Sequence, residues 1–200
     1  MAETSTTLRS GKSLQDIIEA SELSDEAQAL LSEDQTPKGF VDLLIGHEHY
    51  TDAVRFLAHA LPKREAVWWA WVSAKRTAGE DPPPAIQDVL QATEAWIKEP
   101  TDKNCRAAMA KAEAADFSTA AGCAGLAAFF SGDSVAPPDV DPVPPGEYMA
   151  AKAIAGSILL AAVSEEPEKA NERFAGFIQQ GMVVADKIQL WTPPEADGSN

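Results

Sequence analysis

Apolar residues recur at intervals of three and four along most of this chain, in segments that prolines and glycines separate. Tyr50, Val54, Leu57 and Leu61 show the pattern, which places side chains on one face of an α-helix. Alanine, leucine, glutamate and lysine are frequent, whereas runs of β-branched residues are rare, and this composition favours helix over strand. A chain of 200 residues therefore fits a single all-α domain.

The same pattern predicts how the chain is divided. Residues 1–12 and 192–200 are polar and are expected to be flexible, and residues 13–191 are expected to form a helical bundle of about eight to nine helices. The prolines between positions 137 and 145 cannot lie inside a helix, so residues 133–146 should cross the surface in extended form. Solenoid-like helical hairpins are the alternative packing, because the helix pairs within 37–61 and 62–77 resemble solenoid units.

The most hydrophobic segment, residues 147–164, is apolar on nearly every side. Lys152, Gly156 and Ser157 interrupt it, and the apolar run is shorter than the roughly 18–20 residues that a bilayer requires. We therefore predict a central buried helix and no membrane insertion. The N-terminal residues lack the apolar core of a secretory signal, so the sequence predicts a cytoplasmic protein.

The overall charge restricts the class of partner. With 31 acidic and 16 basic side chains, the net charge is −15 at pH 7. This charge repels nucleic acids and anionic lipids, so no nucleic acid is expected to bind, and a protein partner fits better, a basic one most easily. Residues 51–80 differ because they carry five basic and three acidic side chains. This basic segment is either paired with charges inside the molecule or part of a docking surface.

The helix that follows Pro62 is the most distinctive element, because it contains Trp68, Trp69 and Trp71. At 100° per residue, Trp68 and Trp71 share one face, whereas Trp69 points to the other side. We expect Trp68 and Trp71 to be buried and Trp69 to be exposed at a second interface.

Two cations extend this pattern toward a binding function. Arg64 precedes Trp68 by four residues and Lys75 follows Trp71 by four, so both cations can lie along the indole rings. Tryptophan and arginine are also enriched in the energetic centres of protein interfaces. The predicted partner-binding residues are Arg64, Trp68, Trp69, Trp71 and Lys75.

Metal or redox chemistry has weaker support in the sequence. His47 and His49 have a spacing known for metal ligands, but His59 would lie roughly 14 Å from His49 along a helix, and no cysteine is close in sequence. We interpret the histidines as surface or capping residues and predict no metal site. Cys105 and Cys123 are expected to be reduced thiols in the core of two antiparallel helices.

No catalytic motif is present in the sequence. The chain contains no glycine-rich phosphate loop, zinc-protease motif, nucleophile elbow or C-x-x-C pair. We therefore predict a non-enzymatic protein-interaction module without a cofactor. The alternative is a small-ligand-binding or metal-binding helical protein, with a pocket lined by Trp68, Trp71 and Trp96 or a site at His47 and His49.

Residues 61–76, LPKREAVWWAWVSAKR, resemble the Leu-Pro-x-Arg-Glu-Ala-Val-Trp-Trp signature of a family of bacterial domains of unknown function. The close resemblance is confined to this stretch, and it supplies no catalytic residue. Such proteins occur beside components of type VI secretion systems, so the resemblance implies an accessory or adaptor role there. This implication is an association rather than a mechanism.

Overall fold

The computed structural model describes residues 7–164 and 166–193, which form helices and no sheet strand. The prediction of an all-α single domain is confirmed. The helices, counted within these two ranges, are ten α-helices and one 3-10 helix: α1 (Leu14–Ser21), α2 (Asp25–Gln28), α3 (Pro37–Gly46), α4 (Tyr50–Ala60), α5 (Lys63–Ala78), α6 (Pro84–Lys98), α7 (Asp102–Ala115), α8 (Ala120–Phe130), α9 (Met149–Val163), η1 (Pro167–Lys169) and α10 (Ala170–Lys187).

Hydroxyl side chains fix where several helices begin. At α1, the hydroxyl of Ser13 accepts a hydrogen bond from the backbone N–H of Asp16, and the Asp16 carboxylate accepts one from the Ser13 N–H. Such reciprocal caps satisfy N–H groups that have no partner inside the helix. A hydroxyl also caps the start of four other helices, with Ser24 at α2, Thr36 at α3, Thr101 at α7 and Thr119 at α8.

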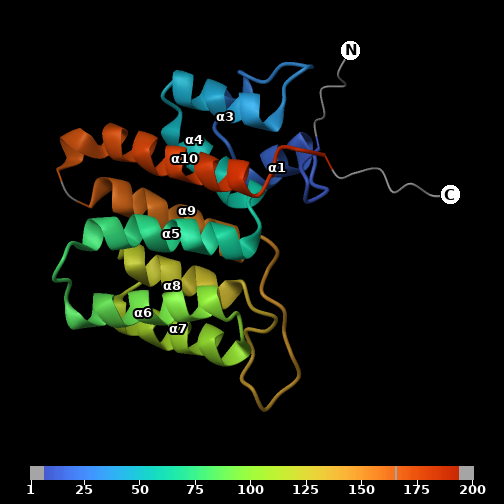
Figure 1. The fold of residues 1–200 in the computed structure, drawn as a ribbon. Helices are drawn as coiled ribbons and strands as arrows, with labels where there is room; N and C mark the ends of the chain where they lie inside the picture. Colours follow the sequence, from blue (N-terminus) through green and yellow to red (C-terminus); the bar gives the residue numbers. More distant parts are fainter. Residues whose placement is uncertain (1–6, 165, 194–200) are drawn as a thin grey trace.

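Helix α9 lies at the centre of the molecule. It packs against α4, α5, α8 and α10, and Ile154 and Ile158 are fully enclosed within it. Figure 1 shows α5 and α10 on the near side of α9, with α6, α7 and α8 stacked below α5. The prediction that this segment is a buried helix is confirmed. Within the described part of the chain, no helix is long and apolar enough to cross a membrane.

Contacts between distant segments distinguish a bundle from a solenoid. Helices α4 and α5 both pack on α9 and α10, although α6, α7 and α8 lie between them in sequence. In a solenoid each repeat contacts only its neighbours. The structure is therefore a single bundle and not an array of stacked hairpins.

Helices α7 and α8 form the predicted antiparallel hairpin and carry the two cysteines. Both thiols are free. Cys105 is buried, but Cys123 is only half-buried, so the expectation of a core position is right for Cys105 alone. Burial raises the pKa of both thiols.

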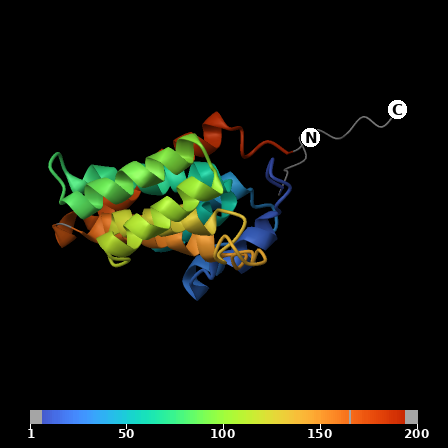
Figure 2. The same ribbon diagram turned by 90° about the horizontal axis from the view of Figure 1, so that it is seen from below.

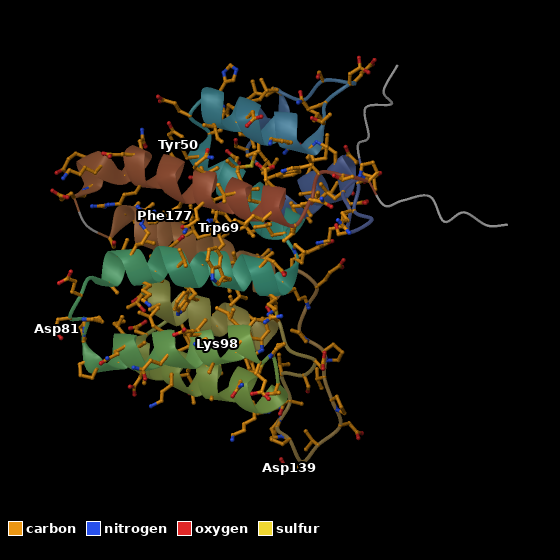
Figure 3. The ribbon with its side chains drawn as sticks, in the orientation of Figure 1. Tyr50, Trp69, Asp81, Lys98, Asp139 and Phe177 are labelled. Atoms are coloured by element: carbon orange, nitrogen blue, oxygen red, sulfur yellow. The ribbon has the colours of Figure 1, made fainter. Side chains whose placement is uncertain are left out.

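The Pro-rich segment runs between α8 and α9 without helix, as predicted. Its two arms are joined where the backbone N–H of Val135 donates to the carbonyl of Val143, at 2.8 Å. The hydroxyl of Ser134 also accepts from the N–H groups of Ala136 and Val143. Figures 1 and 2 show this loop at the same end of the bundle as α1, and Figure 3 places Asp139 at its tip.

The residues just before α1 differ from the expectation of a flexible terminus. Leu8 is fully buried, and the backbone N–H of Arg9 donates to the carbonyl of Leu190 at 2.9 Å. The single large apolar side chain among these polar residues explains the difference, because burying it anchors the residues on either side. Residues 1–6 and 194–200 lie outside the described residues.

Candidate functional site

The tryptophans of α5 are placed the other way round from the prediction. Trp69 is completely buried, and its indole N–H donates to the backbone carbonyl of Phe177 at 2.7 Å. Figure 3 shows Trp69 and Phe177 between α5 and α10. Trp68 and Trp71 are only half-buried. The expectation that Trp69 reaches the surface is therefore wrong.

The small residues of α5 explain this reversal. The buried residues of the helix are Ala66, Val67, Trp69, Ala70, Ser73 and Ala74. Four of these six are alanine or serine, so α8 and α9 can approach the helix closely on that side. The larger side chains of Trp68 and Trp71 therefore lie outside this closely packed side of the helix, where they are only partly covered.

The two predicted cation–indole pairs have different outcomes. Lys75 lies over the Trp71 ring, with 4.7 Å from Nζ to the ring centroid, as expected. Arg64 instead donates from Nε to the carbonyl of Ile97 at 2.7 Å. A cation at the C-terminal carbonyls of a helix is stabilised by the helix dipole, so Arg64 caps α6.

Most of the basic segment is directed to partners within the molecule. The guanidinium of Arg55 donates to the carbonyl of Glu22 at 3.0 Å, and that of Arg76 lies 5.2 Å from the centroid of the Phe177 ring. With Arg64 and Lys75 also engaged, these cations stabilise the fold. The remaining one, Lys63, has an exposed side chain.

A groove with a largely apolar lining lies beside Trp68. It has a volume of about 430 Å³ and lies between α5, the end of α6 and the last turns of α10. We call it the α5–α10 groove. Its apolar lining consists of Trp68, Ile97, Val183, Val184 and Ile188, and its polar lining consists of Arg64, Glu65, Gln180 and Lys187.

Two features of the α5–α10 groove are unusual for the surface of a folded protein. Val183 is 41% exposed although it lies among apolar neighbours. The side-chain oxygen of Gln180 is buried, and no described residue donates a hydrogen bond to it. A buried acceptor without a donor costs about 1–3 kcal/mol, so such groups are rare in folded proteins. A bound molecule that supplies a donor would remove this penalty.

The groove contains only part of the predicted site. It brings together Arg64 and Trp68, whereas Trp69 is in the core, and Trp71 and Lys75 lie on the α6 side, where the Trp71 indole N–H donates to the carbonyl of Leu90. Trp96, which the sequence placed beside Trp68 and Trp71 in a predicted pocket, is buried in the core and does not line this groove.

Gln180 and Val183 were missed because α10 is distant in sequence from α5. A signal for Gln180 does exist: it lies three residues after Phe177 and four before Val184, on the apolar stripe of α10. A polar residue on that stripe predicts a buried amide.

His47 and His49 lie between α3 and α4, where His47 is exposed and His49 is half-buried. The Nδ1 atom of His49 is 3.8 Å from a carboxylate oxygen of Asp52. That carboxylate also accepts hydrogen bonds from the N–H and hydroxyl of Ser24, so it ties α2 to α4. Among the described residues, no group of three histidine, cysteine or acidic side chains is placed to hold a metal ion.

Fold and groove together define an acidic, single-domain helical protein with an apolar surface groove. The chain belongs to a family of unknown function, DUF6931, whose model matches residues 40–185. That range includes α5, so the resemblance of residues 61–76 to a family of unknown function agrees with the match. Neither a curated protein nor a solved structure is detectably similar to the chain.

Proposed function

We propose that this protein is a non-enzymatic interaction module whose α5–α10 groove receives an apolar segment of a protein partner. The observation that carries the proposal is the apolar groove, one of whose lining residues, Gln180, has a buried side-chain oxygen to which no described residue donates a hydrogen bond. The half-buried indole of Trp68 supports it, because partly exposed tryptophans in apolar grooves are typical energetic centres of protein interfaces.

The lining of the groove indicates what the segment should contain. Large apolar side chains would cover Trp68 and Val183, and a hydroxyl, amide or indole N–H would donate to Gln180. The charged residues that line the groove are two cations, Arg64 and Lys187, and one anion, Glu65. A partner segment with an acidic side chain beside its apolar residues would therefore complement the charge of the groove. The acidic faces elsewhere on the molecule would favour a partner that is basic outside this segment.

A more specific version of this proposal is that the protein acts as an accessory or adaptor protein of a type VI secretion system. It rests on the resemblance of residues 61–76 alone, and the groove supports it only in offering a place for a protein to dock. In this form the protein acts in the cytoplasm, where it holds a secretion component or a cargo.

A charged substitution in the groove tests the proposal. Val183→Glu adds a carboxylate to the apolar lining, and Val163→Glu is the matched control, because Val163 is 50% exposed at the end of α9 and does not line the groove. Each tagged protein is used to capture partners from its native cells, with quantitative mass spectrometry as the readout. We expect one protein to be captured by the wild type and the control but not by Val183→Glu.

The captured protein is then purified, and its dissociation constant is measured by calorimetry with each variant. The proposal requires that Val183→Glu weaken binding at least about tenfold, because a charge would be buried in an apolar site. Equal affinity for the two variants would show that the partner binds elsewhere. Capture of no specific protein by the folded wild type would also count against an interaction module.

A further inference from the structure

A second cavity lies near the first residue of α5, where the N-terminal turn and α1 meet the end of α4 and the start of α9. Its volume is about 660 Å³, which falls within the range of about 300–1,000 Å³ typical of small-molecule sites. Its floor is apolar and fully formed by buried side chains, namely Ile17, Ala20, Ala58, Leu61, Ala150 and Ile154. We call it the His59 cavity.

His59 is the unusual residue of this cavity. It is 6% exposed, yet no described residue forms a hydrogen bond with its imidazole, whose nearest aromatic neighbour is the Tyr148 ring at 5.4 Å between centroids. The other buried polar side chains each have a hydrogen-bond partner: Ser21, Asp52, Ser73, Thr93 and Ser157. An unpaired imidazole that lines a cavity is available to a ligand.

The imidazole is neutral at pH 7. Burial lowers the pKa of His59 to about 4, and the nearby charges of Lys12 and Lys152 act in the same direction, against Glu22. A neutral imidazole offers one N–H donor and one acceptor nitrogen. His59 can therefore pair with a polar group of either kind.

Charges of both signs line the cavity. The basic side chains are Lys12 and Lys63. The ammonium of Lys12 donates a hydrogen bond to the backbone carbonyl of His59 at 2.7 Å. Of the acidic side chains, Asp16 caps α1 and Glu19 accepts from Gln15. Lys63 and Glu147 are exposed and form no salt bridge with any described residue.

We propose that the His59 cavity binds a small zwitterion of the amino acid or short-peptide class. The carboxylate lies toward Lys12 and Lys63, the ammonium lies toward Glu147, a polar group pairs with the imidazole of His59, and the apolar part covers the alanine-rich floor. A simple anion would leave Glu147 opposed to it, and a simple cation would meet two lysines. This site is separate from the α5–α10 groove and does not depend on it.

The test follows the imidazole of His59 by NMR while the dipeptide Ala-Leu is added at neutral pH. We expect the His59 resonances to shift in a saturable way, and those of His47 and His49 to stay in place. N-acetyl-Ala-Leu and Ala-Leu amide, which each lack one charge, should bind at least about tenfold more weakly, which is roughly 1.4 kcal/mol. The other Ala-Xaa dipeptides, each at millimolar concentration, extend the search.

Two surface variants test the assignment of the charges. Lys63→Gln and Glu147→Gln should each weaken Ala-Leu binding several-fold without unfolding the protein, because both side chains are exposed. Lys103→Gln, an exposed lysine of α7 outside the cavity, should leave binding unchanged. The proposal is overturned if no dipeptide moves the His59 resonances, or if either capped peptide binds as well as Ala-Leu.

Discussion

The indole of Trp69 combines complete burial with a hydrogen bond to the carbonyl of Phe177. Replacing it with alanine removes the packing of the ring and the hydrogen bond that the indole N–H donates to that carbonyl. We expect Trp69→Ala to lower the free energy of unfolding by about 3–5 kcal/mol, measured by urea denaturation. Trp68→Ala should have a clearly smaller effect, because the Trp68 ring is partly in water already. Equal losses would contradict the burial described for the two rings.

The burial of His59 makes the free energy of unfolding decrease as the pH is lowered. Its pKa is about 4 in the folded protein, against an ordinary value of 6.5, so between these values the unfolded chain binds a proton that the folded protein does not. The contribution to stability is complete above pH 6.5 and is lost as the pH falls toward 4. We expect denaturation of His59→Gln to depend less on pH in this window than that of the wild type, whereas His47→Gln, an exposed control, should follow the wild type.

Among the elements, α10 depends on a glycine for its approach to α5. A Cβ atom at Gly181 would lie 2.9 Å from Cε2 of Trp69 and 3.3 Å from Cδ1 of Leu57, and neither buried side chain has room to move. Gly181→Ala should therefore destabilise the protein by about 1–3 kcal/mol.

Gly176, in the same helix, provides a control of opposite sign. A Cβ atom at this position would have no neighbouring heavy atom within 4 Å, so Gly176→Ala gains helix propensity without a clash. It should stabilise the protein by about 0.5–1 kcal/mol in the same denaturation experiment. A destabilising effect of similar size in both variants would show that the contact between Gly181 and Trp69 does not limit the packing.

The sequence predicted helix starts best, because they depend on residues that are adjacent in the chain. Proline marks the start of α3 at Pro37 and directly precedes α5 at Pro62, so both helices begin within a residue of the ranges 37–61 and 62–77 that the sequence indicated. The burial of α5 was predicted wrongly because a helical wheel ranks faces by large apolar residues. Here the small side chains of Ala66 and Ala70 decide which face its neighbours approach.

Both candidate sites are assembled from distant segments, and this limited what the sequence could show. Arg64 and Trp68 were identified from α5 alone, but Gln180 and Val183 join them only through the packing of α10 on α5. The His59 cavity likewise combines α1, α4 and α9. His59 was interpreted as a surface or capping histidine, and this is wrong because tertiary packing buries its side chain.

For the molecule as a whole, the residues before α1 and after α10 pack together. Leu8→Ala opens a cavity at this junction and should lower the free energy of unfolding by about 2–5 kcal/mol. In a domain of this size, each kcal/mol lowers the Tm by about 2–4 °C, so calorimetry will resolve the change. Leu31→Ala, at a leucine that is 37% exposed, should change the Tm little. A Tm of Leu8→Ala like that of the control would mean that this junction does not contribute to global stability.

The central position of α9 has a consequence for biosynthesis. Helices α4, α5 and α8 all bury their apolar faces against it, so they leave the ribosome before the surface that covers them exists. The nascent chain must keep those faces away from other hydrophobic surfaces until residue 163 has been translated, which takes seconds at about 5–20 residues per second. Arg9, which follows Leu8, is without its hydrogen-bond partner for longer still, because Leu190 is translated after α9. Chaperones that shield these apolar faces during this delay would therefore raise the yield of folded protein.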